Sequence, residues 1–134
     1  MKHLKFLLLS LFSAILISFF EVQIGKRLGY EAWGKIPSVS QISFWALMLV
    51  LLHSVFINRA WTIKKELGVL AFFVFTFFLE GIFWFLINPS LGIGKLVPAN
   101  VSWQKEPWLL LPSEYWVKLG ASVIFYVISN IRSD

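Results

Sequence analysis

The segment that decides the fold covers residues 69–87 and reads VLAFFVFTFFLEGIFWFLI. A helix needs about 20 apolar residues to cross the roughly 30 Å hydrocarbon layer of a membrane, and this segment comes close to that length. Most of its side chains are Leu, Ile, Val or Phe, and each favours insertion by about 0.3–0.6 kcal/mol. Their sum exceeds the roughly 2.5–3.5 kcal/mol that one central carboxylate, Glu80, costs on the same scale. The segment therefore predicts a transmembrane helix in which Glu80 faces protein or water.

Three further segments, residues 4–20, 42–57 and 116–131, have the same apolar character. The chain of 134 residues is 58% hydrophobic and 14% charged, whereas an ordinary soluble domain is about 45–50% apolar and about 25% charged. A chain this short cannot bury such an excess of apolar surface in one globular core. We therefore predict an all-α fold in which residues 1–134 form a single transmembrane domain, an integral membrane four-helix bundle.

The connections between the predicted spans differ in character. Residues 21–41 are rich in Gly and charged residues, which predicts an irregular turn region, and residues 58–68 form a short basic turn between antiparallel spans. Residues 88–115 form a long loop between the third and fourth helices that is rich in Trp and Pro, and such loops are usually functional or disordered. Its aromatic content argues against disorder. We expect the segment either to lie on the membrane surface or to fold back over the bundle as a lid, with three candidate lid residues: Trp103, Trp108 and Glu114.

The sequence leaves two questions of topology open: the orientation of the chain in the membrane and the retention of the first span. The positive-inside rule returns a tie, because the 12 Lys and Arg residues divide equally between the two sides. The compact cluster of Arg59, Lys64 and Lys65 favours both termini in the cytoplasm. A secretory signal is the competing interpretation of the first span, since Lys2 and Lys5 precede it. The small-x-small pattern of a cleavage site is missing after the span, so we favour a retained helix.

The candidate functional residues are polar side chains inside the predicted spans. Glu80 shares one helical face with three others: Thr76, Trp84 and Asn88. With alternating helix directions Lys118 reaches the depth of Glu80, so we expect a Glu80–Lys118 pair. His53 lies about 10 Å away along the membrane normal, at about 1.5 Å per residue, which excludes a direct bond to Glu80. Each of these residues also has a purely structural interpretation. Glu80 would be a carboxyl group that holds helices together, and His53 would be a histidine with its hydrogen bonds satisfied. Lys118 would be an interfacial lysine whose ammonium group reaches toward the membrane surface.

Composition excludes several classes of site. The chain has no cysteine, which removes disulfides, Fe–S clusters and thiolate metal sites, and its two histidines do not suffice for a His-rich metal centre. We therefore expect no metal and no cofactor. The net charge of +5 is explained by Lys and Arg residues that flank membrane spans and meet anionic headgroups. The expected partners are membrane lipids and a second copy or another membrane protein, and not nucleic acid.

Three stretches carry a family resemblance: EGIFWFLINPSLG at residues 80–92, WQKEPW at 103–108 and PSEYW at 112–116. Together they resemble a pattern in small multi-pass prokaryotic membrane proteins of uncharacterised function. Those relatives carry a His after the first loop Trp and an acidic residue after the span Glu, where this chain has Gln104 and Gly81. The resemblance implies the topology and draws attention to Glu80, Trp84 and Asn88, and it implies no activity. The small multidrug exporters also have four short spans, but their membrane Glu is in the first helix, so that similarity is architectural only.

These observations favour a non-enzymatic accessory, assembly or regulatory component of a membrane, most simply a bacterial plasma membrane. The first alternative is an oligomeric small transporter or channel with Glu80 as its ion or proton site, because four short helices rarely enclose a pathway alone. The second alternative is a membrane enzyme that acts on a lipid or isoprenoid, with Glu80 or Glu114 as its acid or base. It lacks a recognisable nucleophile–base pair.

Overall fold

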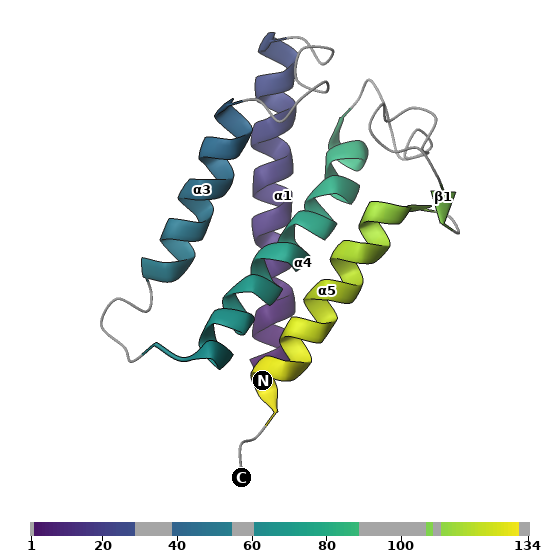
Figure 1. Ribbon diagram of the computed structural model, residues 1–134. Helices are drawn as coiled ribbons and strands as arrows, with labels where there is room; N and C mark the ends of the chain where they lie inside the picture. The colour runs from purple at the N-terminus through teal and green to yellow at the C-terminus, as the bar shows by residue number, and fades with distance from the viewer. Residues whose placement is uncertain (1, 29–38, 55–60, 89–106, 109–110, 132–134) are drawn as a thin grey trace.

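The computed structural model describes residues 2–28, 39–54, 61–88, 107–108 and 111–131. Within these ranges the predicted all-helical class is confirmed, with four helices: α1 (Lys2–Leu28), α3 (Val39–Ser54), α4 (Ile63–Ile87) and α5 (Ser113–Asn130). Helix α4 lies in the middle, α1 and α5 pack along it, and α3 touches it at few points (Figure 1). The packed core is therefore formed by three helices, with α3 at the periphery.

The helices alternate in direction, so they define two ends of the molecule (Figure 1). The terminal end contains the starts of α1 and α4 and the ends of α3 and α5. The distal end contains the ends of α1 and α4 and the starts of α3 and α5. At the terminal end the Lys64 ammonium donates to the carbonyl of Ile131, at 2.7 Å, just after α5. This alternation places Glu80 and the start of α5 in the same half of the molecule, as the sequence predicts.

Helix α4 contains the predicted segment 69–87 and begins earlier, at a defined cap. Thr62 is the N-cap, and its hydroxyl accepts a hydrogen bond from the backbone N–H of Lys65 at 3.3 Å. At the other end the N–H of Asn88 donates to the carbonyl of Trp84 at 3.0 Å. Pro89 follows in the sequence, and the residue before a proline is disfavoured in a helix. Both bounds of α4 thus have a local cause.

Helix α1 continues through residues 21–28, so the predicted irregular turn is wrong for that part of the connection. Val22 and Gly25 are buried in the bundle, and Lys26 and Arg27 occupy the last turn, where cations stabilise the negative end of the helix dipole. A glycine inside a helix costs only about 1 kcal/mol, which burial of the neighbouring side chains offsets. The glycine-rich composition of residues 21–41 therefore predicted the end of the first helix too early.

Small residues allow α1 and α4 to approach each other closely. Ser10, Ala14 and Ser18 recur every four residues on one face of α1, and all three are fully buried. This is the small-xxx-small spacing that brings helix backbones together in membrane proteins. The hydroxyl of Ser18 lies 3.0 Å from the carbonyl oxygen of Glu80 in α4, so the two backbones meet at the depth of the candidate carboxylate.

Helix α5 begins three residues before the predicted span 116–131. It follows a two-residue antiparallel pairing of β1 (Pro107–Trp108) with β2 (Leu111–Pro112), in which Trp108 is opposite Leu111. Its buried residues are Tyr115 and Ser122. Of the predicted span 42–57, residues 42–54 belong to α3, and residues 55–57 lie outside the described part of the chain.

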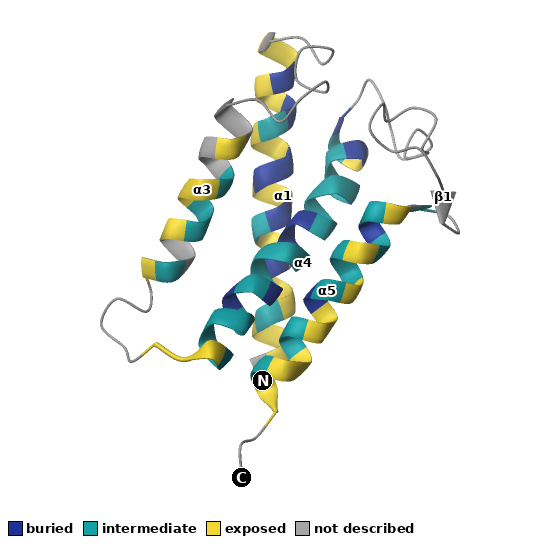
Figure 2. Cartoon of the chain, in the orientation of Figure 1, coloured by how far each residue is buried: buried dark blue, intermediate teal, exposed yellow. Residues whose placement is uncertain are grey.

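Many large apolar side chains are exposed, whereas several polar side chains are buried. Figure 2 shows how exposed and buried positions are distributed along the helices. Phe12 of α1 is 62% exposed and Ile124 of α5 is 58% exposed, while Thr76 and Asn88 of α4 are 1% and 0% exposed. Two described helices, over His3–Arg27 and Ile63–Ile87, are long and apolar enough to cross a membrane. Exposed large apolar side chains are thus numerous on α1 and α5, whereas water-soluble domains rarely expose apolar patches larger than a few hundred Å².

Candidate functional site

Glu80 meets a second carboxyl group, that of Glu21 from α1. The two side chains hydrogen-bond to each other, and both are partly buried. A carboxylate has no hydrogen to donate, so a bond between two carboxyl groups requires a proton on one of them. We call Glu21 and Glu80 the carboxyl pair. It links α1 to α4, and two carboxyl groups in such contact can share a proton.

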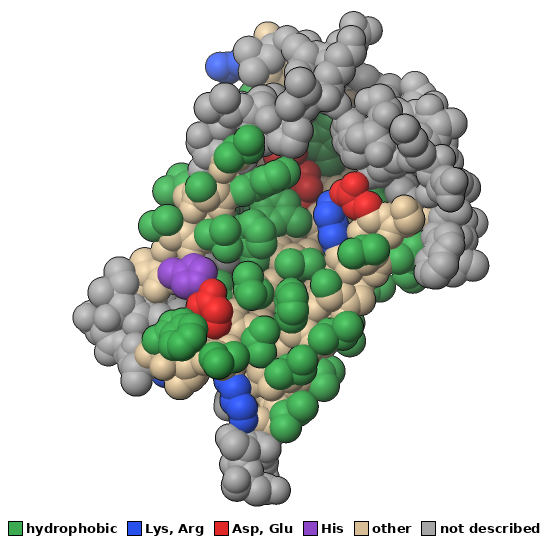
Figure 3. All heavy atoms as spheres, viewed as in Figure 1, with side chains coloured by type: hydrophobic (Ala, Val, Ile, Leu, Met, Phe, Trp, Pro, Cys, Tyr) green, Lys and Arg blue, Asp and Glu red, His purple; other side chains and the backbone are tan. Residues whose placement is uncertain are grey.

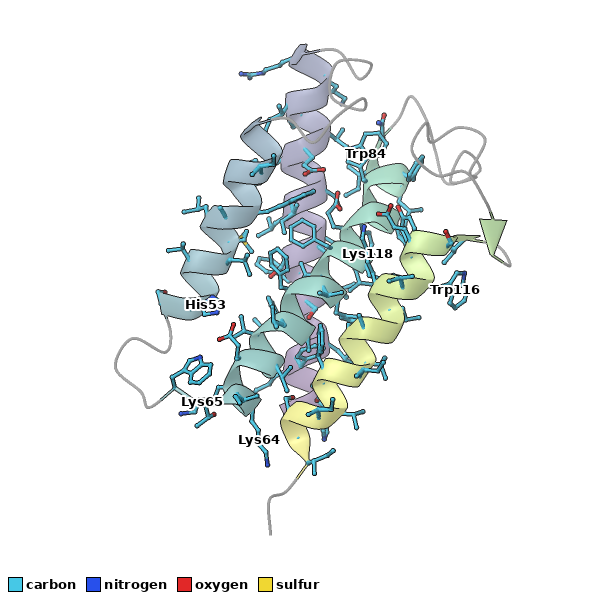
Figure 4. The ribbon with its side chains drawn as sticks, viewed as in Figure 1. His53, Lys64, Lys65, Trp84, Trp116 and Lys118 are labelled. Carbon is cyan, nitrogen blue, oxygen red and sulfur yellow. The ribbon has the colours of Figure 1, made fainter. Side chains whose placement is uncertain are left out.

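The partner of Glu80 differs from the predicted one. The Lys118 ammonium hydrogen-bonds to the Glu114 carboxylate one turn earlier on α5, and it acts on Glu80 only through its charge. The expected Glu80–Lys118 pair is therefore wrong as a direct contact. The reason is local, because the i,i+4 spacing on α5 places the Glu114 carboxylate within hydrogen-bond reach of Lys118. Figure 4 shows Lys118 between α4 and α5, whereas Trp116 points outward.

Tyr115 completes the α5 side of the site. Its ring is 4% exposed and packs against Phe85 and Phe78 of α4. Its hydroxyl lies over Gly81, where a Cβ atom would contact the hydroxyl and approach two ring carbons to 2.9 Å. The absence of a side chain at Gly81 therefore leaves room for a buried phenol ring. The sequence reasoning did not single out Tyr115, although it follows Glu114 in the quoted stretch PSEYW.

The other polar residues of α4 line up as the helical spacing predicts. Thr76 and Asn88 are both buried, and Trp84 is partly buried with its ring packed edge-on against Phe85 at 5.1 Å between centroids. Figure 4 shows Trp84 near the distal end of α4. These residues extend the polar face of α4 above and below the carboxyl pair, so the face continues from the middle of the helix to its C-cap.

His53 belongs to a second polar cluster, at the terminal end. Its Nε2 donates to Glu66 of α4 at 2.8 Å, its Nδ1 lies 2.6 Å from the Leu49 carbonyl, and Trp61 Nε1 donates to the same carboxylate at 3.1 Å. The expectation that His53 does not bond directly to Glu80 agrees with this geometry. The sequence analysis did not consider Glu66 as a partner of His53. The two residues lie near the facing ends of α3 and α4, and an antiparallel hairpin places such residues at the same level. Figure 3 shows the histidine beside an acidic side chain on an otherwise largely hydrophobic face.

We expect Glu66→Ala to loosen α3 from α4. The His53–Glu66 bond and the edge-on contact of Trp45 with Phe77 are direct links between these helices, so α3 has little else to hold it. Two spin labels on single cysteines at Leu47 and Ile124, both exposed, report the distance between α3 and α5. The distance distribution should broaden in Glu66→Ala and remain narrow in the control Glu114→Ala. Equal distributions in the two variants would show that the cluster does not position α3.

The lid candidates are only partly described. Trp103 lies outside the described residues, and for Trp108 the structure describes only the backbone of β1. Glu114 is in the first turn of α5, where it binds Lys118 and interacts through its charge with Glu80. Glu114 thus belongs to helix α5 and interacts with the carboxyl pair, and it is not part of a loop. The proposed lid remains a prediction.

Within the described ranges no group of three His, Cys, Asp or Glu side chains is arranged to hold a metal ion. The arrangement can bind a proton between Glu21 and Glu80, with Lys118 as the nearby positive charge. Comparison with protein-family models, curated proteins and solved structures finds no match. The chemistry of the site must therefore be argued from these residues alone.

Proposed function

We propose that the chain is a multi-pass integral membrane protein, with α1, α3, α4 and α5 as a membrane-embedded four-helix bundle. The observation that carries this proposal is an exterior rich in exposed large apolar side chains around an interior that contains polar ones. Leu8, Phe12 and Phe20 of α1 are more than half exposed, whereas Ser10 and Ser18 on the same helix are fully buried. Lipid accommodates exposed apolar side chains, and polar contacts between helices are favoured where water is absent. A bacterial plasma membrane is the proposed location.

We further propose that the protein is a non-enzymatic accessory, assembly or regulatory component. Several of its polar groups are engaged with each other: Glu80 with Glu21, Ser18 with the Glu80 backbone and, at a partly exposed position, Lys118 with Glu114. The contacts of Glu80 with Glu21 and with Ser18 join α1 to α4, and none of the three contacts presents a nucleophile with an adjacent base. Because α1 supplies half of the carboxyl pair and a fully buried small-residue face, retention of α1 in the mature protein is part of the proposal.

Membrane integration and topology give the first test. The chain should stay in the membrane pellet after an alkaline carbonate wash and dissolve only in detergent. Because the sequence lacks cysteine, single cysteines at exposed Lys5 and Asn130 should react with an impermeant maleimide from one side of the membrane. Cysteines at exposed Lys26 and Ser113 should react from the other side. Release by carbonate, or labelling of Lys5 and Asn130 from opposite sides, would contradict the proposal.

A second candidate function is favoured by one observation, the contact between the carboxyl groups of Glu21 and Glu80, which can share a proton. In an oligomeric transporter or channel this proton would exchange with the two sides of the membrane, and Glu80 would be the ion or proton site. This candidate requires a dimer or larger assembly in mild detergent and proton-coupled flux in liposomes. A monomer without flux would rule it out.

Two substitutions at one position separate the candidates. Glu80→Gln preserves size and hydrogen bonding but cannot release a proton at physiological pH, whereas Glu80→Ala removes the contact. For an accessory component, complementation of a deletion strain should be unchanged in Glu80→Gln and should fall in Glu80→Ala only as far as the amount of folded protein falls. Loss of complementation in a fully folded Glu80→Gln protein would favour the proton-handling candidate instead.

A further inference from the structure

A cavity of about 170 Å³, open on one side, lies between α1 and α5 in the half of the molecule near the terminal end. Its walls are largely apolar: Phe6 and Leu7 from α1, Phe75 from α4 and Val123 from α5. Neither Glu21 nor Glu80 lines it. The cavity is therefore separate from the carboxyl pair, and its chemistry is different.

The aromatic side chains around the cavity connect its two walls. His3 Nδ1 and the Tyr126 hydroxyl hydrogen-bond to each other, and their rings meet edge-on with centroids 5.6 Å apart. Phe6 packs on Tyr126 at 4.5 Å and on Phe75 at 5.9 Å between centroids. Helices α1 and α5 pack mainly on α4, and these rings add direct contacts between α1 and α5 beside the cavity.

The lining determines what fills this space. A bound water needs two to four polar partners, and the Ser122 hydroxyl in the wall already donates to the Leu119 carbonyl at 2.8 Å. The exposed surfaces on both sides, at Leu8 and Ile124, are apolar as well. A hydrocarbon chain fits this environment, and it enters from the side where Leu7 and Val123 are exposed.

The positive charge at the terminal end indicates which lipid headgroup would bind there. Lys5, Lys64 and Lys65 lie in the first turns of α1 and α4, and the acidic residue among them, Glu66, is engaged by His53 and Trp61. Basic residues at a membrane surface attract anionic lipids. We propose that the cavity binds one acyl chain of an anionic phospholipid, with the phosphate beside His3 at the basic terminal end. This inference rests on the proposed membrane integration.

Lipid binding to the purified full chain tests the proposal. Native mass spectrometry from detergent micelles would follow titration with phosphatidylglycerol and with phosphatidylcholine of the same acyl chains. Wild type should retain one phosphatidylglycerol in preference to phosphatidylcholine by about fivefold or more. Val123→Trp should fill the cavity and abolish the preference. Ile124→Trp is the matched control, because Ile124 is equally exposed but does not line the cavity.

The outcomes are distinct. His3→Gln should reduce the preference for phosphatidylglycerol while an acyl chain still binds. Equal binding of the two lipids by wild type, or equal binding by Val123→Trp and Ile124→Trp with the same circular dichroism, would overturn the lipid site. Release of wild type from membranes by carbonate would instead overturn membrane integration. A chain that resists carbonate but shows no preference for phosphatidylglycerol would contradict the lipid site and leave membrane integration supported.

Discussion

Gly81→Ala is expected to destabilise the packing of α5 on α4, whereas the same substitution at Gly120 is not. A Cβ at Gly81 would contact the Tyr115 hydroxyl and come within 2.9 Å of two carbons of its ring. Because that ring is 4% exposed and packed among other side chains, it has little room to move. Overpacking of this kind costs about 1–3 kcal/mol. At Gly120 a Cβ meets nothing within 4 Å, so alanine there should be neutral or stabilising by up to about 1 kcal/mol.

SDS-induced unfolding of the detergent-solubilised protein, followed by tryptophan fluorescence, measures both effects. The double variant Gly81→Ala/Tyr115→Phe lacks the nearest atom and should recover part of the loss. Equal stability of Gly81→Ala and Gly120→Ala would show that the Tyr115 ring does not rest on Gly81. A loss that Tyr115→Phe leaves unchanged would point to the ring carbons as the sole obstacle.

The sequence predicted the helical class because hydrophobic runs near membrane length have few other structures open to them. Alternating direction then placed Glu80 and the start of α5 in one half of the molecule. Element bounds were predicted less well. The run of glycine and charge after residue 20 resembled a turn, yet α1 continues to Leu28 because tertiary packing outweighs local propensity.

The partners of the candidate residues were harder to predict than their depth. Depth depends on position along one helix, whereas contact depends on how each helix is rotated about its axis. Lys118 was within reach of Glu80 by depth, but it bonds to Glu114 on its own helix. The partner of Glu80 is Glu21, the first residue of the segment 21–41 that the sequence predicted as a turn region. The spacing of Ser10, Ala14 and Ser18 was the available signal, because it identifies the face of α1 that meets α4.

The carboxyl pair gives the second large prediction, a double-mutant cycle at Glu21 and Glu80. Glu21→Leu or Glu80→Leu alone leaves the remaining carboxyl between α1 and α4 without its hydrogen-bond partner, which costs about 1–3 kcal/mol. The double variant replaces both polar groups by apolar ones, and such replacements are often nearly neutral. We therefore expect the double variant to be more stable than either single variant, with a coupling energy of about 0.5–3 kcal/mol.

The control for this cycle is Glu114→Leu combined with Glu80→Leu. Glu114 interacts with Glu80 only through its charge, and its hydrogen bond to Lys118 is a partly exposed i,i+4 contact, a type worth about 0.5 kcal/mol or less. Its effect should therefore add to that of Glu80→Leu without rescue. Additive losses at Glu21 and Glu80 would show that the two carboxyl groups do not share a proton, because a shared proton makes the stability of each side chain depend on the other. Strong coupling would establish the α1–α4 bridge on which both candidate functions depend, since an accessory protein needs it to hold its helices and a transporter needs it to bind its proton.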